Sequence, residues 1–341
     1  MLAPLAGFSD AALRQICSLQ GADLCYTEMV SAKGLLYDSQ RTASLLLIPP
    51  AQAAAKFKAV QLFGSEPEIF AAVLESSPLL APFEIVDINM GCPVHKVVRA
   101  GEGSALMKDL KRAGAIIEAV CKAAPDKLVT AKIRAGWNAS SINAVEAAQV
   151  LEESGAHAVT VHARTRDQFY AGECDYNLVA RVREAVKIPV IVSGGIVCGD
   201  SYNRIRKATG CSSVMIGRGS LGTDLFARLK NLTARAGQGD GGVLHPQLTK
   251  EVPKIIPTKE KPKITGTDLC ASATHPRTSV SSLFLEHLGY LREYYGEHYA
   301  FTNIRKFTPY YFKGLEGARQ LRARINTASG TAQIEKILGD L

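Results

Sequence analysis

Eight short, mostly apolar runs constrain the fold of this chain more than any other feature. Each run is followed by a stretch whose apolar residues have helical spacing, as in 143–154. Strands that alternate with helices favour βαβ units and a parallel sheet. Eight such units before residue 218 fit a closed (β/α)8 barrel better than an open, doubly wound sheet. The expected strands are Leu2–Pro4, Leu24–Glu28, Ala59–Phe63, Ile85–Asn89, Val129–Arg134, Ala158–His162, Val190–Ser193 and Ser213–Gly217.

The pattern changes after residue 236. Residues 237–282 contain the run GQGDGG, several prolines and scattered lysines, with poor periodicity, which is typical of a linker or an insertion. Helical periodicity returns in 283–341. We therefore expect an α/β protein: a (β/α)8 TIM barrel over 1–236, a linker or disordered insertion over 237–282, and a small C-terminal helical domain over 283–341.

Composition excludes several classes of protein. With 47% hydrophobic residues and a net charge of +8, the chain can bury a core, unlike disordered or collagen-like sequences. No two of its eight cysteines form a CxxC pair, so no metal site is expected. The N-terminus lacks the pattern of a signal peptide, and no apolar run is long enough to span a membrane. We expect a cytoplasmic monomer without a membrane contact.

Polar residues and glycines gather where the expected strands end. In a barrel the carboxyl ends of the strands share one rim, where barrel enzymes place their active sites. Residues far apart in the sequence would therefore meet there. The residues concerned are Gln61, Asn89, Cys92, Lys132, His162, Ser193, Gly194, Gly195, Gly217 and Arg218.

Cys92 is the candidate catalytic residue. It lies in the turn Asn89-Met90-Gly91-Cys92-Pro93, which would project the thiol from the rim. A free thiol is mostly protonated at pH 7, so it could act as a general acid, or as a thiolate if its pKa were lowered. The alternative is a small buried apolar residue, which is what most free cysteines are.

Lys132, His162 and two glycine loops predict a site for an anion. A lysine is seldom buried without a partner, so Lys132 at a strand end is expected to face a ligand. His162 could be a structural histidine, but Lys132, Arg164 and Arg166 nearby favour a ligand role. The loops 193–195 and 217–219 close the last two strands, where barrels commonly bind phosphate, although turn glycines also occur without any ligand.

A basic, aromatic segment lies in the expected helical domain. Residues 305–324 hold six basic residues against one acid, Glu316, with four aromatic residues among them. Basic and aromatic residues together suit RNA phosphates and unstacked bases. The same pattern also fits a helix with one solvated face and one core face. The basic residues are Arg305, Lys306, Lys313, Arg319, Arg322 and Arg324.

Ordered motifs along 1–235 and 284–341 resemble the tRNA-dihydrouridine synthase family, flavoproteins that reduce uridine in tRNA. Two positions depart from the usual family pattern: Leu5 replaces a methionine, and Ser193-Gly194-Gly195 replaces Asn-Gly-Asp. The motifs are the segments APLAGFSD (3–10), EMV (28–30), QLFG (61–64), DINMGCP (87–93), KIRAGW (132–137), VHARTR (161–166), GRG (217–219) and KGLEGAR (313–319).

The resemblance implies an FMN-binding barrel with a tRNA-binding helical domain, and NADPH as the reductant. Cys92 would protonate C5 of the uracil, and Asn89 would lie near that base. FMN would be held by the backbone at Pro4, Leu5 and Ala6, by Gln61, Lys132 and His162, and by Ser193, Gly194, Gly195, Gly217 and Arg218. Contacts to tRNA would come from Arg164, Arg166, Arg305, Lys306 and Lys313.

Two other functions remain open from the sequence. The chain could be another FMN-dependent barrel oxidoreductase that acts on a small molecule, although this would not account for the basic helical tail. It could also be a non-catalytic tRNA-binding protein. The presence of Cys92, Lys132 and His162 argues against that second alternative.

Overall fold

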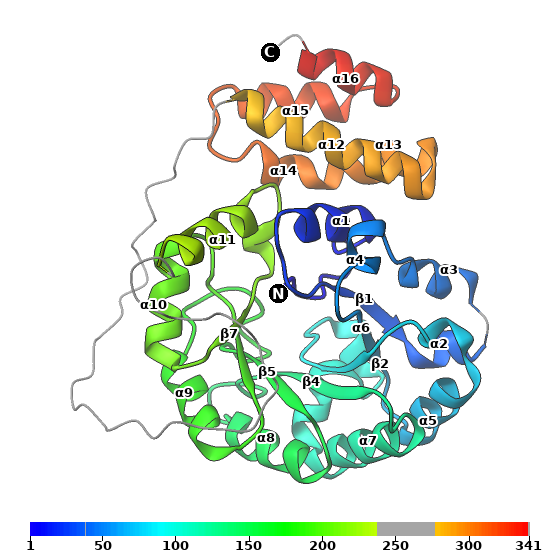
Figure 1. The fold of residues 1–341 in the computed structure, drawn as a ribbon, viewed down its shortest axis with the longest axis vertical. Helices are drawn as coiled ribbons and strands as arrows, with labels where there is room; N and C mark the ends of the chain where they lie inside the picture. Colours follow the sequence, from blue (N-terminus) through cyan, green and yellow to red (C-terminus); the bar gives the residue numbers. More distant parts are fainter. Residues whose placement is uncertain (38, 237–276, 340–341) are drawn as a thin grey trace.

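A computed structural model describes residues 1–37, 39–236 and 277–339 (Figure 1). Seven parallel strands form one sheet, in which each strand pairs with the next along the chain. Helices surround the curled sheet on its outer side (Figure 1). The strands are β1 (Tyr26–Ser31), β2 (Ala59–Phe63), β3 (Ile85–Met90), β4 (Leu128–Arg134), β5 (Ala158–His162), β6 (Val190–Ser193) and β7 (Ser213–Met215).

Leu2 closes the barrel between β1 and β7. It forms parallel bridges to Cys25 and to Ile216, and the Ala3 N–H donates to the Ile216 carbonyl at 2.8 Å. The predicted first strand is therefore present, but it is reduced to a bridge. Pro4, which follows Ala3, has no N–H with which to extend the hydrogen-bonded ladder. The expected eight-membered barrel is confirmed, with Leu2 in the eighth position.

The outer helices bury their apolar faces against the sheet. Asp10 accepts from the Leu13 N–H at the start of the first helix, and Asp175 caps α9 in the same way through Leu178. The helices of the barrel are α1 (Ala11–Leu19), α2 (Ala32–Leu36), α3 (Gln40–Ala43), α4 (Pro50–Ala53), α5 (Pro67–Ser76), α6 (His95–Arg99), α7 (Leu110–Ala123), α8 (Ala144–Glu153), α9 (Tyr176–Ala185), α10 (Gly199–Thr209) and α11 (Leu225–Ala236).

Alternation along the strands decides which side chains enter the barrel. A small apolar cluster includes Ala59, Ile85, Ala158 and Ile191, one from each of four strands. Residues two positions further along a strand point to the same side. The interior therefore also receives Gln61, Asp87, Thr160 and Ser193. The interior therefore becomes polar toward the carboxyl ends of the strands, which is the end of the barrel where the candidate site lies.

The C-terminal helices form a separate layer over α1 (Figure 1). The helix α12 begins at Arg277, six residues before the predicted domain boundary at 283. The sequence pattern did not indicate these first residues because several serines and threonines in 278–282 interrupt the apolar periodicity. Residues 237–276 of the predicted linker lie outside the described residues. The helices of this layer are α12 (Arg277–Tyr295), α13 (Glu297–Ile304), α14 (Thr308–Tyr311), α15 (Ala318–Asn326) and α16 (Thr331–Gly339).

The described residues contain neither a membrane-spanning helix nor a cluster of metal ligands. None of the helices in 1–236 and 277–339 combines the length and the apolar character that a membrane crossing needs. Within the same ranges, no group of histidine, cysteine and acidic side chains has the arrangement of a metal site.

Candidate active site

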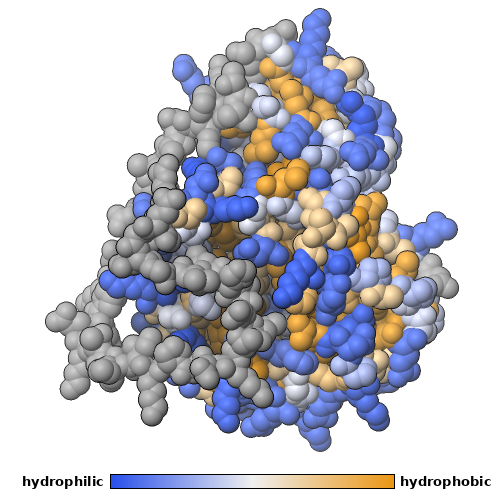
Figure 2. Space-filling model, viewed as in Figure 1, coloured by the Kyte–Doolittle hydropathy of each residue, from blue (hydrophilic) through white to orange (hydrophobic). Residues whose placement is uncertain are grey.

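A cavity of about 510 Å³ lies at the carboxyl ends of the strands. Figure 2 shows hydrophilic side chains around a hollow on this side of the molecule. Tyr310 of the C-terminal layer reaches the cavity, so both parts of the chain contribute to its wall. Predicted site residues among its lining are Pro4, Leu5, Ala6, Asn89, Cys92, Lys132, His162, Arg164, Ser193, Gly194, Gly195, Gly217 and Arg218.

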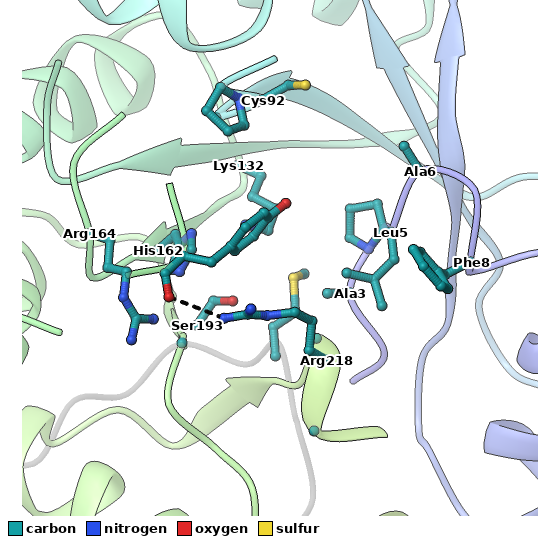
Figure 3. A pocket seen from close by; sticks show the side chains of 18 of the residues that line it. Ala3, Leu5, Ala6, Phe8, Cys92, Lys132, His162, Arg164, Ser193 and Arg218 are labelled. Atoms are coloured by element: carbon teal, nitrogen blue, oxygen red, sulfur yellow. Dashed lines mark hydrogen bonds between the residues drawn. The ribbon is translucent and has the colours of Figure 1, made fainter. Parts of the chain in front are cut away.

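Strand register places the polar side chains next to one another. Asn89 of β3 pairs in register with Lys132 of β4. His162 of β5 lies between Arg134 on one side and Ser193 on the other. Cys92 and Arg218 lie on opposite sides of the cavity, with Lys132 and His162 between them (Figure 3). The rim predicted from the sequence is thus a continuous surface.

Asn89 holds the turn that carries Cys92. Its side-chain oxygen accepts from the Gly91 N–H at 3.2 Å and from the Cys92 N–H at 2.9 Å. On the other side of the turn, Ser104 donates through its hydroxyl to the Cys92 carbonyl at 2.9 Å. Burial raises the pKa of the Cys92 thiol above its ordinary value. Cys92 is therefore a fixed and protonated thiol at neutral pH, which suits a general acid.

A chain of buried polar groups supports Asn89 from below. The Asn89 amide donates to Gln61 Oε1 at 2.7 Å, and Gln61 donates to Asp87 Oδ2 at 2.6 Å. The Thr130 hydroxyl donates to Asp87 Oδ1 at 2.6 Å. Burial raises the pKa of Asp87 to about 6, while these two hydrogen bonds and nearby Lys132 act in the opposite direction. Gln61 is fully buried and does not line the cavity, so its predicted contact with a cofactor stays a prediction.

Lys132 and His162 bring different electrostatic properties to the cavity. Burial, and then the neighbouring Arg134, lower the pKa of Lys132 to about 8. Burial also holds the pKa of His162 well below its ordinary value, and Lys132 and Arg134 add to this effect. At neutral pH, Lys132 is therefore cationic and His162 is a neutral imidazole that can donate one hydrogen bond.

The two predicted glycine loops form an open backbone cradle. Gly194 and Gly195 have φ of +109° and +77°, and Tyr176 donates through its hydroxyl to the Gly194 carbonyl at 3.2 Å. A Cβ on Gly194 would lie 2.9 Å from His162 Cδ2, so a larger residue does not fit here unless that side chain shifts. Arg218 and Arg164 line the same side of the cavity (Figure 3).

Sequence reasoning missed Arg134. The residue is 2% exposed, and it donates to the Gly91 carbonyl at 2.7 Å and to the Thr165 and Phe169 carbonyls at 2.7 and 2.8 Å. It thereby ties the Cys92 turn to the loop after β5. A second positive side chain at the end of the strand that carries Lys132 was the signal that could have indicated it.

Tyr170 was also missed. Its ring lies between two guanidinium groups, 4.5 Å from Arg218 and 5.7 Å from Arg134, and it lines the cavity. Its neighbour Phe169 has φ of +52°, the only positive φ among the described non-glycine residues. The hydrogen bonds from Arg134 hold this unfavourable backbone conformation.

The remaining predicted basic residues have other surroundings than the cavity. Arg166 stacks on Trp137 at 4.7 Å and pairs with Asp167 at 3.0 Å. Arg305 lies over the Phe301 ring, and Lys313 is exposed. Lys306 lies at the contact between the helical layer and the barrel. None of these four is part of the cavity lining.

The chain is similar to known proteins over nearly its whole length. Residues 1–339 match the family model described as dihydrouridine synthase (Dus). The tRNA-dihydrouridine synthase B of Pseudomonas aeruginosa is 34% identical over 331 residues, which cover 97% of this chain and 89% of that protein. The protein of the same name from Pasteurella multocida is 31% identical and spans 95% of this chain and 87% of its own.

Solved structures share the barrel at low sequence identity. A histamine dehydrogenase from Rhizobium sp. 4-9 superposes with a TM-score of 0.51 at 14% identity, over 67% of this chain and 43% of that one. A morphinone reductase variant in complex with tetrahydroNAD gives 0.50 at 12% identity, over 68% and 86%. These similarities concern the fold alone. The match over residues 1–339 confirms the resemblance that the sequence motifs indicated: the chain belongs to the dihydrouridine synthase family.

Proposed function

We propose that this protein is a tRNA-dihydrouridine synthase that uses FMN and NADPH to reduce the C5=C6 bond of uridine in tRNA. One observation carries the proposal. In a member of this family, a fixed and protonated thiol at Cys92 faces a basic glycine cradle across one cavity. We further propose that it acts as a monomer in the cytoplasm.

The residues of the cavity fit FMN. The cradle of Gly194 and Gly195 leaves no room for a Cβ, and Arg218 and Lys132 supply positive charge for a phosphate. Pro4, Leu5 and Ala6 would contact the flavin ring through their backbone on the opposite side of the cavity. A bound flavin would carry electrons from the nicotinamide nucleotide to the base.

The chain's own residues perform the acid and binding steps. Saturation of the C5=C6 bond needs a proton at C5, and Cys92 Sγ would donate it. Asn89 would orient the turn and lie beside the uracil, because its side chain already fixes the Cys92 N–H. The Cys92 thiolate that remains would then recover a proton from water. His162, neutral at neutral pH, would donate a hydrogen bond to the cofactor without adding charge.

Cations at the cavity mouth and on the helical layer would contact the tRNA backbone. Arg164 and Arg166 lie on the loop after β5, while Arg305 and the exposed Lys313 lie on the helical layer. Phosphate contacts would offset the cost of moving the target base out of the folded tRNA, which is a few kcal/mol. The two groups would hold the RNA on both sides of the cavity mouth.

A direct assay tests the proposed function. We expect the purified protein to carry a flavin, and to convert uridine to dihydrouridine in an unmodified tRNA transcript when NADPH is added. Nucleoside mass spectrometry detects the two added hydrogens. A yellow protein that leaves tRNA unchanged but reduces a small unsaturated carbonyl compound would instead favour the small-molecule oxidoreductase. A colourless protein that binds tRNA would favour the non-catalytic alternative.

The lowered pKa of Lys132 predicts how FMN binding depends on pH. The ammonium group loses its proton as the pH rises through about 8, so its attraction for an anionic cofactor is lost over that range. We expect the affinity of the flavin-free protein for FMN to fall between pH 7 and 9, measured by fluorescence quenching. In Lys132→Met, affinity should be weaker at pH 7 and nearly independent of pH over this range. An equally steep pH dependence in that variant would contradict the assignment.

A further inference from the structure

A group of buried polar side chains lies where the helical layer meets the barrel, apart from the cavity. Asp10 begins α1, His287 belongs to α12, and Lys306 precedes α14. Asp10 and His287 are 3% and 0% exposed, so water from the surface does not reach them freely. We call these three residues the interdomain junction.

Two atoms of the interdomain junction have no hydrogen-bond partner among the described residues. They are Asp10 Oδ2 and His287 Nε2, both fully shielded from solvent. Asp10 Oδ1 already accepts from the Leu13 N–H, and His287 Nδ1 already shares a hydrogen bond with the Tyr311 hydroxyl at 3.0 Å. A buried polar atom without a partner is costly, so each of these atoms needs one.

The separations match those that a bridging water spans. His287 Nε2 lies 3.9 Å from Asp10 Oδ1, and Lys306 Nζ lies 4.0 Å from Asp10 Oδ2. Both gaps are too long for a direct hydrogen bond, yet they are suitable for two groups that share one water. A carboxylate, an imidazole and an ammonium group supply the two to four polar partners that a buried water requires.

The junction lies directly behind the loop that forms one wall of the cavity. Phe8 of that loop lines the cavity, and its ring also packs edge-on against Phe307 and Tyr310 at 5.4 and 5.5 Å. The Ala11 N–H donates to the Tyr295 hydroxyl at 2.9 Å. Glu28 accepts from the Gly7 N–H. Burial lowers the pKa of Lys306, and the nearby carboxylates of Asp10 and Glu28 oppose this effect. The loop is therefore tied to both the barrel and the helical layer.

We propose that Asp10, His287 and Lys306, joined by a buried water, fix the helical domain against the cavity-forming loop and so set its position relative to Cys92. Apolar packing between Phe8 and Phe307 favours contact but specifies little direction. Hydrogen bonds through a shared water depend on angle and distance, and therefore select one docking geometry. The link to tRNA rests on the proposed function, whereas the link between the two domains does not.

The first test concerns the junction itself and needs no tRNA. In a high-resolution crystal structure of the protein we expect an ordered water within hydrogen-bond distance of Asp10 Oδ2 and His287 Nε2; a dry junction would overturn the proposal. Lys306→Met keeps most of the apolar stem but removes the ammonium group. We expect it to accelerate amide hydrogen exchange in residues 4–12 of the barrel, although the substitution lies in the helical domain.

Two further variants distinguish the loss of the junction's interaction from the loss of a positive charge on the helical domain. Asp10→Asn keeps the Oδ1 acceptor that caps α1, removes the carboxylate charge and replaces the Oδ2 acceptor with an NH2 donor. Combined with Lys306→Met, it should add little to the effect of either single variant, because both break the same interaction. Lys336→Met is the matched control, since this exposed lysine of α16 removes the same charge from the same domain.

The second test measures catalysis with tRNA. We expect Lys306→Met to raise KM for tRNA by about tenfold with kcat nearly unchanged, as for the loss of a binding geometry, and with normal flavin content. Lys306→Arg should recover much of this loss, and Lys336→Met should behave as the wild type.

Besides a dry junction, three results would overturn the proposal. The first is unchanged exchange and unchanged KM in Lys306→Met. The second is loss of flavin, which would mean that Lys306 supports the cofactor loop alone. The third is a higher KM with normal exchange and a salt dependence of tRNA affinity reduced by about one phosphate contact, which would make Lys306 a direct tRNA contact. If the wild type forms no dihydrouridine, the proposed function fails, and the exchange experiment still tests the junction.

Discussion

Replacing Cys92 with alanine is expected to lower dihydrouridine formation by at least about a hundredfold, the usual size of a general-acid contribution. The thiol lies at the cavity wall on a turn fixed by Asn89 and Ser104, and burial raises its pKa, so it holds its proton at neutral pH. Alanine offers no proton, and water would have to reach C5 in its place. The loss should therefore appear in kcat with tRNA.

The same variant should keep the steps that precede proton donation. We expect Cys92→Ala to bind FMN normally. Its flavin should be reduced by NADPH at the wild-type rate, which is measured as the loss of flavin absorbance. Cys121→Ala is the matched control, because this free thiol hydrogen-bonds the Gly155 carbonyl on the outside of the barrel. Full activity of Cys92→Ala would exclude Cys92 as the general acid. Slow reduction by NADPH would mean that Cys92 acts in the reduction of the flavin rather than in the reduction of uridine.

Rules of barrel architecture predicted several polar residues and two loops of the cavity lining from the sequence. Alternation places Asn89, Lys132 and His162 inside the barrel, and the end of each strand brings them to one rim. Ser193 and the two glycine loops follow from the same rule. These inferences succeed because the position of each residue depends on its own strand and on the closure of the sheet.

Contacts that depend on long-range docking could not be predicted in this way. Arg134 bonds to three carbonyls on two loops, and no local pattern specifies those partners. Gln61 hydrogen-bonds to Asn89 and Asp87 inside the barrel, an arrangement that the sequence did not indicate, and its predicted contact with a cofactor stays a prediction. Lys306 was predicted to contact tRNA, and no local pattern indicated that the docking of the helical layer would bring it to Asp10, 296 positions away in the sequence.

The second large effect is expected from Gly195→Ala, which should weaken FMN binding by roughly a hundredfold or more. Gly195 has φ of +77°, a conformation that costs an alanine about 1–2 kcal/mol. A Cβ at this position would also overlap the Tyr176 hydroxyl, and relief of such crowding costs about 1–3 kcal/mol. A loop that relaxes to relieve both costs must recover the cradle conformation to bind FMN, and at about 1.4 kcal/mol for each factor of ten the two costs together reach this range.

A double variant separates the two causes. Tyr176→Phe removes the hydroxyl that a Cβ on Gly195 would meet, together with its hydrogen bond to the Gly194 carbonyl. If crowding dominates, Gly195→Ala/Tyr176→Phe should bind FMN more tightly than Gly195→Ala alone. If the backbone conformation dominates, the second substitution should not help. FMN titration of the flavin-free proteins measures both effects.

Gly289→Ala is the control for adding a methyl group. Gly289 lies in α12 with no atom within 4 Å of the added Cβ, and alanine is the better helix former by about 1 kcal/mol. We expect this variant to bind FMN as the wild type does and to unfold at a higher temperature. If Gly195→Ala also bound FMN with wild-type affinity, the loop 193–195 would not hold the phosphate. The cofactor would then have to depend on Arg218 and Lys132 for its anchorage.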